Sequence, residues 1–365
     1  MTLNLTTTRP FNPNNVMPWS GIKRVALKPD GTVYKYHNLT TTGDSTNAMF
    51  SDGTTMTWSD YETAGYNCLV EIPKFYYKKV GFNESTTDFT NGHAWYISDS
   101  PADGYELHPA FYRDRTHLTD DTSGNAIEVD YRYAPVFLGW VDGNRKLRSL
   151  PFKTPTVNIT IGNARNYAKV NDNGWGIMDF NLLFAIQLLY SVEYGNYDSQ
   201  TAIGRGYVDD NSSSIVTGGT LQYGNNTYGE TTGKKQMSYR GIEDLWGNCY
   251  RWIDGFFCNS SRHILIGNKG FNNTGSGYMD KGISSFINAG GYIGNIQSNK
   301  DCGFVISASN GSAITKMYDD GYLYAGDLPI AGAGWNYGSN GGAFGFSCSY
   351  GASGTNSDVA ASLCF

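Results

Sequence analysis

Charged side chains are scarce in this sequence of 365 residues: Asp, Glu, Lys and Arg make up 16% of it, against about 25% in an average soluble domain. The formal net charge is −6, which argues against a surface built on phosphate contacts, because such a surface needs clustered Lys and Arg. We therefore expect no nucleic-acid partner. The longest apolar-rich run, residues 180–190, is too short to span a bilayer, and the first residues do not form a signal peptide, so we expect no membrane insertion.

Recognisable catalytic and metal-binding motifs are also missing. The six cysteines include no C-x-x-C pair, and no two of the five histidines have the spacing of a zinc site on a helix. No nucleophile elbow, phosphate-binding loop or dinucleotide-binding glycine motif follows an expected strand, and the acidic pairs lack the ligand spacing of a calcium loop. The sequence thus predicts no enzyme activity, no metal, no cofactor and six reduced, mostly buried thiols.

Glycine and aromatic residues take the place of charge. The chain has 45 Gly, 27 Tyr, 18 Phe and 8 Trp residues, and Asn, Ser and Thr are dense throughout. Tyrosine, glycine and small polar side chains are typical of adaptable binding surfaces such as antibody loops.

Several short segments have strand character. Residues 25–28 and 32–36 flank Pro29-Asp30-Gly31, which predicts a β-hairpin. Residues 68–73, 75–77 and 131–140 are rich in β-branched and aromatic side chains and are expected to be strands.

Two helices are expected in mid-chain. After Asp179, a suitable N-cap, apolar residues recur at helical spacing until Gly195, and a weaker helix covers residues 163–170. Short strands and Gly/Asn/Ser loops follow residue 204. This order predicts an α+β fold with extensive loops. We expect a β-rich module over residues 1–60, followed by a ligand-binding domain over residues 61–365.

Two segments carry the functional argument. Residues 239–255 combine turn residues with two tryptophans and indicate a structural turn motif. Residues 328–357 contain no Asp, Glu, Lys, Arg or His, and within them Phe344, Phe346, Cys348 and Tyr350 alternate with Gly345, Ser347 and Ser349. This pattern fits either a binding face with a small polar side or a Gly-rich edge strand.

Both segments resemble a known family. Residues 241–252, GIEDLWGNCYRW, resemble the G-L-x-D-x-x-G-N-x-x-E-W motif of the C-type lectin fold, which formylglycine-generating enzymes and variable proteins of diversity-generating retroelements share. Residues 332–344, GAGWNYGSNGGAF, resemble the variable-region pattern G-G-x-W-x-x-G-x-x-x-G-x-F of the retroelement proteins. Residues 17–21, 70–75 and 199–206 are similar to stretches of phage tail proteins in this group.

The resemblance implies a C-type lectin-like domain with two helices, small antiparallel sheets and a variable region at about 332–362. It implies a phage receptor-binding protein in the virion tail, often homotrimeric, which contacts other tail proteins and a host cell-surface protein or glycan. Trp335, Phe344, Phe346 and Val359 would be scaffold. The ligand-facing positions carried over from the family are Asn336, Tyr337, Ser339, Asn340, Gly345, Ser347, Ser349, Tyr350, Gly351, Thr355, Asn356 and Ser357. Tyr337 and Tyr350 are the expected hot spots, although the alternation could equally place Tyr350 on the buried side.

Each alternative function would need its own set of residues. A formylglycine-generating-type oxidoreductase would need a reactive cysteine pair near Cys348 and Cys364, which lack basic neighbours in the sequence. A calcium-dependent lectin would need ligand motifs that are absent. A static carbohydrate-binding adhesin, on a virion or on a bacterial cell surface, would share the fold without diversification.

Overall fold

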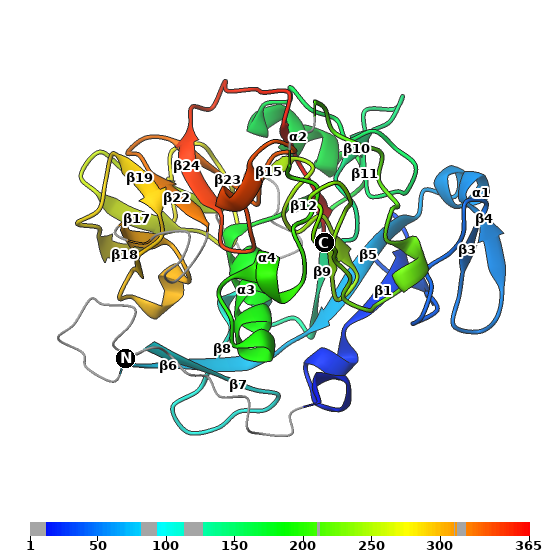
Figure 1. Ribbon diagram of the computed structural model, residues 1–365, viewed down its shortest axis with the longest axis horizontal. Helices are drawn as coiled ribbons and strands as arrows, with labels where there is room; N and C mark the ends of the chain where they lie inside the picture. Colours follow the sequence, from blue (N-terminus) through cyan, green and yellow to red (C-terminus); the bar gives the residue numbers. More distant parts are fainter. Residues whose placement is uncertain (1–11, 82–92, 113–126, 210–211, 310, 312–318) are drawn as a thin grey trace.

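The computed structural model describes residues 12–81, 93–112, 127–209, 212–309, 311 and 319–365 (Figure 1). In these residues a few helices are combined with many small sheets whose strands are mainly antiparallel. The expected α+β class is confirmed in this general form. No helix in the described part of the chain is both long and apolar enough to cross a membrane.

The expected N-terminal hairpin forms one side of a four-stranded antiparallel sheet. β1 (Lys23–Leu27) pairs with β2 (Val33–Tyr36), and Gly31 closes the turn with φ 78° and a hydrogen bond from its N–H to the Lys28 carbonyl at 2.9 Å. β1 also pairs with β5 (Asn67–Pro73), and β5 pairs with β9 (Tyr131–Pro135). The boundary expected near residue 60 therefore falls between strands of one sheet.

The expected strand over 131–140 is shorter than predicted. β9 ends at Pro135, which has no N–H to continue a ladder, and only Trp140 returns to strand geometry, in β10 (Trp140–Val141). The strand expected at 75–77 is found as β6 (Tyr76–Gly81), which pairs with β7 (His93–Ser98) and β8 (Glu106–Leu107).

Both expected helices are confirmed. α3 (Phe180–Tyr194) begins where the Asp179 carboxylate accepts a hydrogen bond from the Leu182 N–H at 2.9 Å, and it ends at Gly195 with φ 57°. Its residues 180–191 are all buried, and the helix stands at the centre of the view in Figure 1. α2 (Ile161–Lys169) begins two residues earlier than expected, because Thr160 caps it. No α-helix follows α4 (Ser199–Ala202) within the described ranges.

A six-stranded sheet has the order β19-β22-β24-β23-β15-β25. β24 lies inside it, parallel to β22 and antiparallel to β23, so the alternative of an edge strand is wrong. The strands are β19 (Ala289–Tyr292), β22 (Asp320–Leu323), β24 (Phe346–Tyr350), β23 (Leu328–Ala331), β15 (Tyr250–Trp252) and β25 (Val359–Ala360).

The remaining elements form small sheets and turns around this framework. They are β3 (Asn47–Met49) with β4 (Thr55–Thr57), α1 (Trp58–Thr63), β10 with β11 (Leu147–Arg148), β12 (Gly176–Ile177) with β26 (Leu363–Cys364), β13 (Ser238–Tyr239) with β14 (Ile242–Glu243), β16 (Phe256–Cys258) with β17 (His263–Ile266) and β18 (Met279–Ile283), and β20 (Asn295–Ile296) with β21 (Ile306–Ala308).

The segment 239–255 is a buried structural motif, as its composition indicates. Trp246 and Trp252 are fully buried. Asp244 accepts hydrogen bonds from the side chains of Gln236 at 2.7 Å and Asn248 at 2.9 Å, while Asn248 also bonds both backbone groups of Ile215. The burial and mutual pairing of these polar groups fix the turn that leads into β15.

Candidate ligand-binding site

The segment that precedes β24 is held in place by hydrogen bonds to α3 and α4. Gln187 of α3 donates a hydrogen bond to the Ala343 carbonyl at 2.9 Å, and Ser199 of α4 accepts one from the Ala343 N–H at 2.9 Å. Gln200, also of α4, donates to the Gly338 carbonyl at 2.9 Å. The chain around 338–343 is thereby fixed on the helical core even though it is largely irregular.

Glycines in this segment are required by close packing. A Cβ on Gly342 would clash with the carboxylate of Asp319, and a Cβ on Gly345 would clash with the carbonyl oxygen of Gly332. The Asp319 carboxylate accepts a hydrogen bond from the Phe344 N–H at 2.6 Å. Burial is the main cause that raises the pKa of Asp319, to about 8.

Three neighbouring strands place one row of side chains on the same face of the sheet. Ser347 of β24 is the register partner of Tyr322 on β22 and of Ile330 on β23. The Ser347 and Ser349 hydroxyls hydrogen-bond each other at 2.7 Å. The floor of the site is therefore apolar at Ile330 and hydroxyl-lined beside it.

Aromatic rings stand over this floor. Tyr337 meets Tyr250 edge-on, with ring centroids 5.1 Å apart and planes at 82°. Tyr350 meets Trp252 with centroids 5.7 Å apart and planes at 88°. Both tail tyrosines are half-buried, so each ring is supported by the core and also contributes surface.

Together these side chains enclose an open pocket of about 370 Å³. Its lining residues are Tyr250, Tyr322, Ile330, Asn336, Tyr337, Ser347, Ser349, Tyr350, Asn356 and Asp358.

Ionisable groups gather around the pocket. Tyr250, Tyr322, Tyr337 and Asp358 line it, and Asp320 lies two residues before Tyr322 on β22, on the same face of that strand. Burial is the main cause that raises the pKa of Tyr337 to about 12 and that of Asp320 to about 6. Burial also raises the pKa of Asp358, whose Oδ1 is buried with no hydrogen-bond partner among the described residues.

The structure gathers part of the predicted site into this pocket. Of the twelve expected positions, those that line it are Asn336, Tyr337, Ser347, Ser349, Tyr350 and Asn356. Gly351, Thr355 and Ser357 are exposed on the loop after β24, at the top of Figure 1. Ser339 and Asn340 lie in a 3-10 turn (Gly338–Asn340), where the Asn340 side chain accepts a hydrogen bond from the Tyr292 hydroxyl at 2.6 Å.

Gly345, which directly precedes β24, does not lie where the sequence predicts it. It was expected on the small polar face, but it is buried, because its backbone packs against Gly332. The scaffold positions Phe344, Phe346 and Val359 are buried as expected, and Trp335 is half-buried.

Four lining residues were missed: Tyr250, Tyr322, Ile330 and Asp358. Three of them come from other strands of the sheet: Tyr322 and Ile330 are the register partners of Ser347, and Tyr250 lies on β15, beyond β23. Asp358 carried one signal, since it is the charge that ends the uncharged run.

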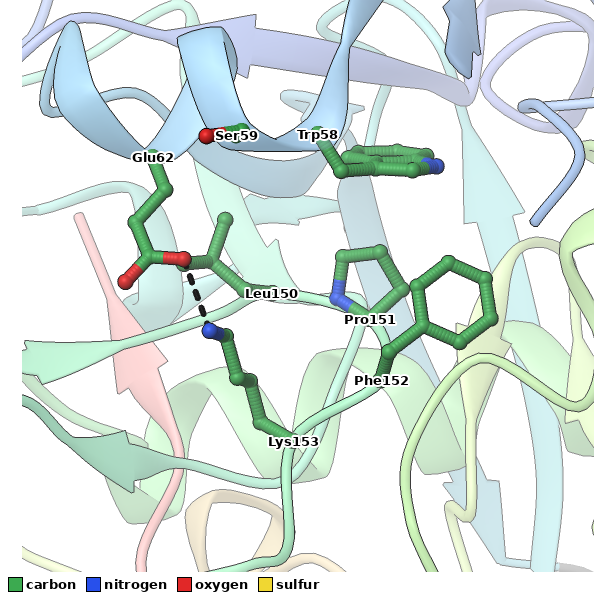
Figure 2. Close-up of a pocket in the computed structure, with 7 residues that line it drawn as sticks. All are labelled: Trp58, Ser59, Glu62, Leu150, Pro151, Phe152 and Lys153. Carbon is green, nitrogen blue, oxygen red and sulfur yellow. Dashed lines mark hydrogen bonds and ion pairs between the residues drawn. The ribbon is translucent and has the colours of Figure 1, made fainter. Parts of the chain in front are cut away.

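A second pocket, of about 250 Å³, lies between α1 and residues 150–153 (Figure 2). Trp58 and Phe152 form its aromatic side, with ring centroids 6.4 Å apart, and Glu62 pairs with Lys153 at 2.7 Å. No predicted site residue lines it. This pocket, like the one around β24, has aromatic rings beside a carboxylate, but here a lysine neutralises the acid.

All six cysteines are buried, as expected, and none is joined to another in a disulfide. Burial raises the pKa of Cys348, and the Cys364 thiol donates a hydrogen bond to the Ile177 carbonyl at 3.0 Å. The two thiols lie on strands of different sheets, β24 and β26. This arrangement disfavours the thiolate that the oxidoreductase alternative requires. No group of three or more His, Cys, Asp and Glu side chains suited to a metal ion occurs in the described ranges.

Neither a protein-family profile nor a curated protein matches the chain. Among solved structures, the chain is similar to the Major Tropism Determinant U1 variant, with a TM-score of 0.34 and 14% sequence identity over 94% of this chain and 71% of that chain. The Major Tropism Determinant M1 variant gives a TM-score of 0.32 and 13% identity over the same shares of the two chains.

Proposed function

We propose that this protein is a phage receptor-binding protein that attaches to a host cell-surface ligand through the pocket around β24 and its rim. The observation that carries the proposal is the convergence of Asn336, Tyr337, Ser349, Tyr350 and Asn356 on one open pocket. All five are ligand-facing positions that the resemblance to a variable region implies from the sequence alone. Tyrosine beside small polar side chains suits a surface whose contacts change while its scaffold does not.

The proposal has finer parts that rest on the resemblance. The variable region is residues 332–362 of a C-type lectin-like domain, diversified by a retroelement. Residues 1–60 contribute to attachment to other tail proteins, and the protein is a homotrimer in the virion. Several copies of a weakly binding face would then gain avidity.

The test is to fill the pocket without disturbing the core. Ser349 is half-buried on the pocket face, so Ser349→Trp should occupy the space of a ligand. Ser51, in an exposed turn, provides the matched control Ser51→Trp. We expect Ser349→Trp to reduce binding of the purified protein to host cells at least about tenfold, a loss of one order in affinity, with Ser51→Trp unchanged.

Binding is measured by flow cytometry on host cells, and folding of both variants by circular dichroism melting. Equal binding by folded Ser349→Trp and wild-type protein would place the receptor site elsewhere.

A further inference from the structure

The pocket around β24 has carboxyl groups in or beside it but no basic side chain among its described lining residues. Asp358 lines it and Asp320 lies beside it on β22, two residues before the lining residue Tyr322, whereas no Lys, Arg or His is among the described residues that line it. The uncharged run over 328–357 explains this, because most lining residues come from a segment without basic side chains. The carboxylates are therefore not neutralised locally.

The second pocket provides an internal comparison. Its carboxylate, Glu62, is paired with Lys153 (Figure 2). The Lys153 ammonium group also lies 4.2 Å from the centroid of the Trp140 ring. At that site the protein itself supplies a cation to an acid and to an aromatic ring. Around β24 the acids and the rings are present and the cation is not.

The tyrosines of the pocket add a second argument. Tyr250, Tyr322, Tyr337 and Tyr350 line it, and each brings an aromatic ring and a hydroxyl oxygen that can accept a hydrogen bond. Lone pairs and ring faces both attract a positively charged hydrogen-bond donor. Ile330 on the floor offers an apolar contact for an alkyl chain that carries such a donor.

We infer that this pocket binds an alkyl-ammonium group, and that its physiological occupant is a lysine side chain of a host surface protein. The identity of the occupant rests on the proposed function, whereas the preference for a cation does not. Burial disfavours the ionised form of Asp320 and Asp358 and therefore raises the pKa of both carboxyl groups. A bound cation would offset this free-energy cost of ionisation.

The test uses two probes of nearly the same shape and different charge. Choline carries a quaternary ammonium, and 3,3-dimethylbutan-1-ol replaces its nitrogen with carbon. Binding to the full chain is measured by ligand-observed nuclear magnetic resonance. We expect choline to bind at least about fivefold more tightly than the alcohol, as a cation over tyrosine rings implies.

Variants locate the effect. Asp358→Asn should remove the preference for choline while leaving binding of the alcohol unchanged, and Glu62→Gln in the second pocket should change neither. Equal binding of the two probes, binding of neither up to the solubility limit of the alcohol, or a choline preference that survives Asp358→Asn would overturn the inference.

The occupant is tested by competition with choline. Nα-acetyl-lysine N-methylamide should displace choline more effectively than glucosamine does, and the reverse order would overturn the lysine assignment. The proposed function and the cation preference can fail separately. If the pocket prefers choline but Ser349→Trp still binds host cells fully, attachment through this pocket is refuted. If host binding depends on Ser349 but choline is not preferred, only the cation inference is refuted.

Discussion

The ring of Tyr350 stands edge-on against that of Trp252, with centroids 5.7 Å apart. Trp252 is fully buried and belongs to the structural motif of β15, whereas Tyr350 is half-buried and lines the pocket. One contact thus joins the buried core to the surface that is proposed to meet the ligand.

Truncation of Tyr350 should therefore affect stability as well as binding. Tyr350→Ala loses the edge-to-face contact and part of a buried ring, which should lower the free energy of unfolding by about 1 to 2 kcal/mol. Tyr350→Phe keeps the ring and loses only the hydroxyl, which accepts a hydrogen bond from Asn356 at 3.3 Å, so its stability should stay within about 0.5 kcal/mol of wild type. Urea unfolding measures both. Equal destabilisation by the two variants would show that the ring contact contributes nothing.

Replacement by alanine should change protein stability at only one of two glycines in the expected ligand-facing set. Gly345→Ala places a Cβ against the Gly332 carbonyl and should cost about 1 to 3 kcal/mol, as overpacking does. Gly351→Ala meets no atom within 4 Å, and Gly351 is exposed, so the change should be within about 0.5 kcal/mol. Thermal melting compares the two variants. A Gly345→Ala protein as stable as Gly351→Ala would mean that position 345 is open to variation after all.

Stability should depend on pH through Asp320. Its folded-state pKa is raised to about 6 from 3.8, so the folded state holds this proton more tightly than the unfolded state does. The resulting stabilisation is fully present below pH 3.8 and is lost as pH rises through 6. Asp320→Asn cannot ionise, so its stability relative to wild type should be greater at pH 7.5 than at pH 4.5.

Urea unfolding at the two pH values measures this difference, with Asp103→Asn as the control because Asp103 is exposed. A difference between Asp320→Asn and wild type that does not change with pH would contradict the assignment.

Local signals predicted local structure well. Asp179 and Gly195 marked the two ends of α3, and Pro29-Asp30-Gly31 marked the turn between β1 and β2, because caps and turns depend on residues close in sequence. The alternation around β24 is present in the structure, where Ser347 and Ser349 line the pocket while Phe346 and Cys348 are buried.

Residues supplied by other strands could not be found in this way. Tyr322 and Tyr250 reach the pocket only through the order β22-β24-β23-β15, and a parallel pairing such as that of β22 with β24 leaves no mark in either strand. The burial of Gly345 depends on Gly332, a neighbour brought close by tertiary folding, while alternation alone suggested an exposed position. The uncharged run over 328–357 contributes both to the core and to the surface. Residues 328–334 and 341–348 are buried, and residues 351–353 and 355–357 are exposed.

The position of β24 inside its sheet has a kinetic consequence. β15 pairs with β23 and β25, which lie far along the chain, and β24 must be inserted between β22 and β23 before the ladders on either side are complete. Contacts of such long sequence separation require loop closure first and therefore form slowly. We expect the six-stranded sheet to form late in folding, and the pocket that it carries to be among the last parts of the protein to take shape.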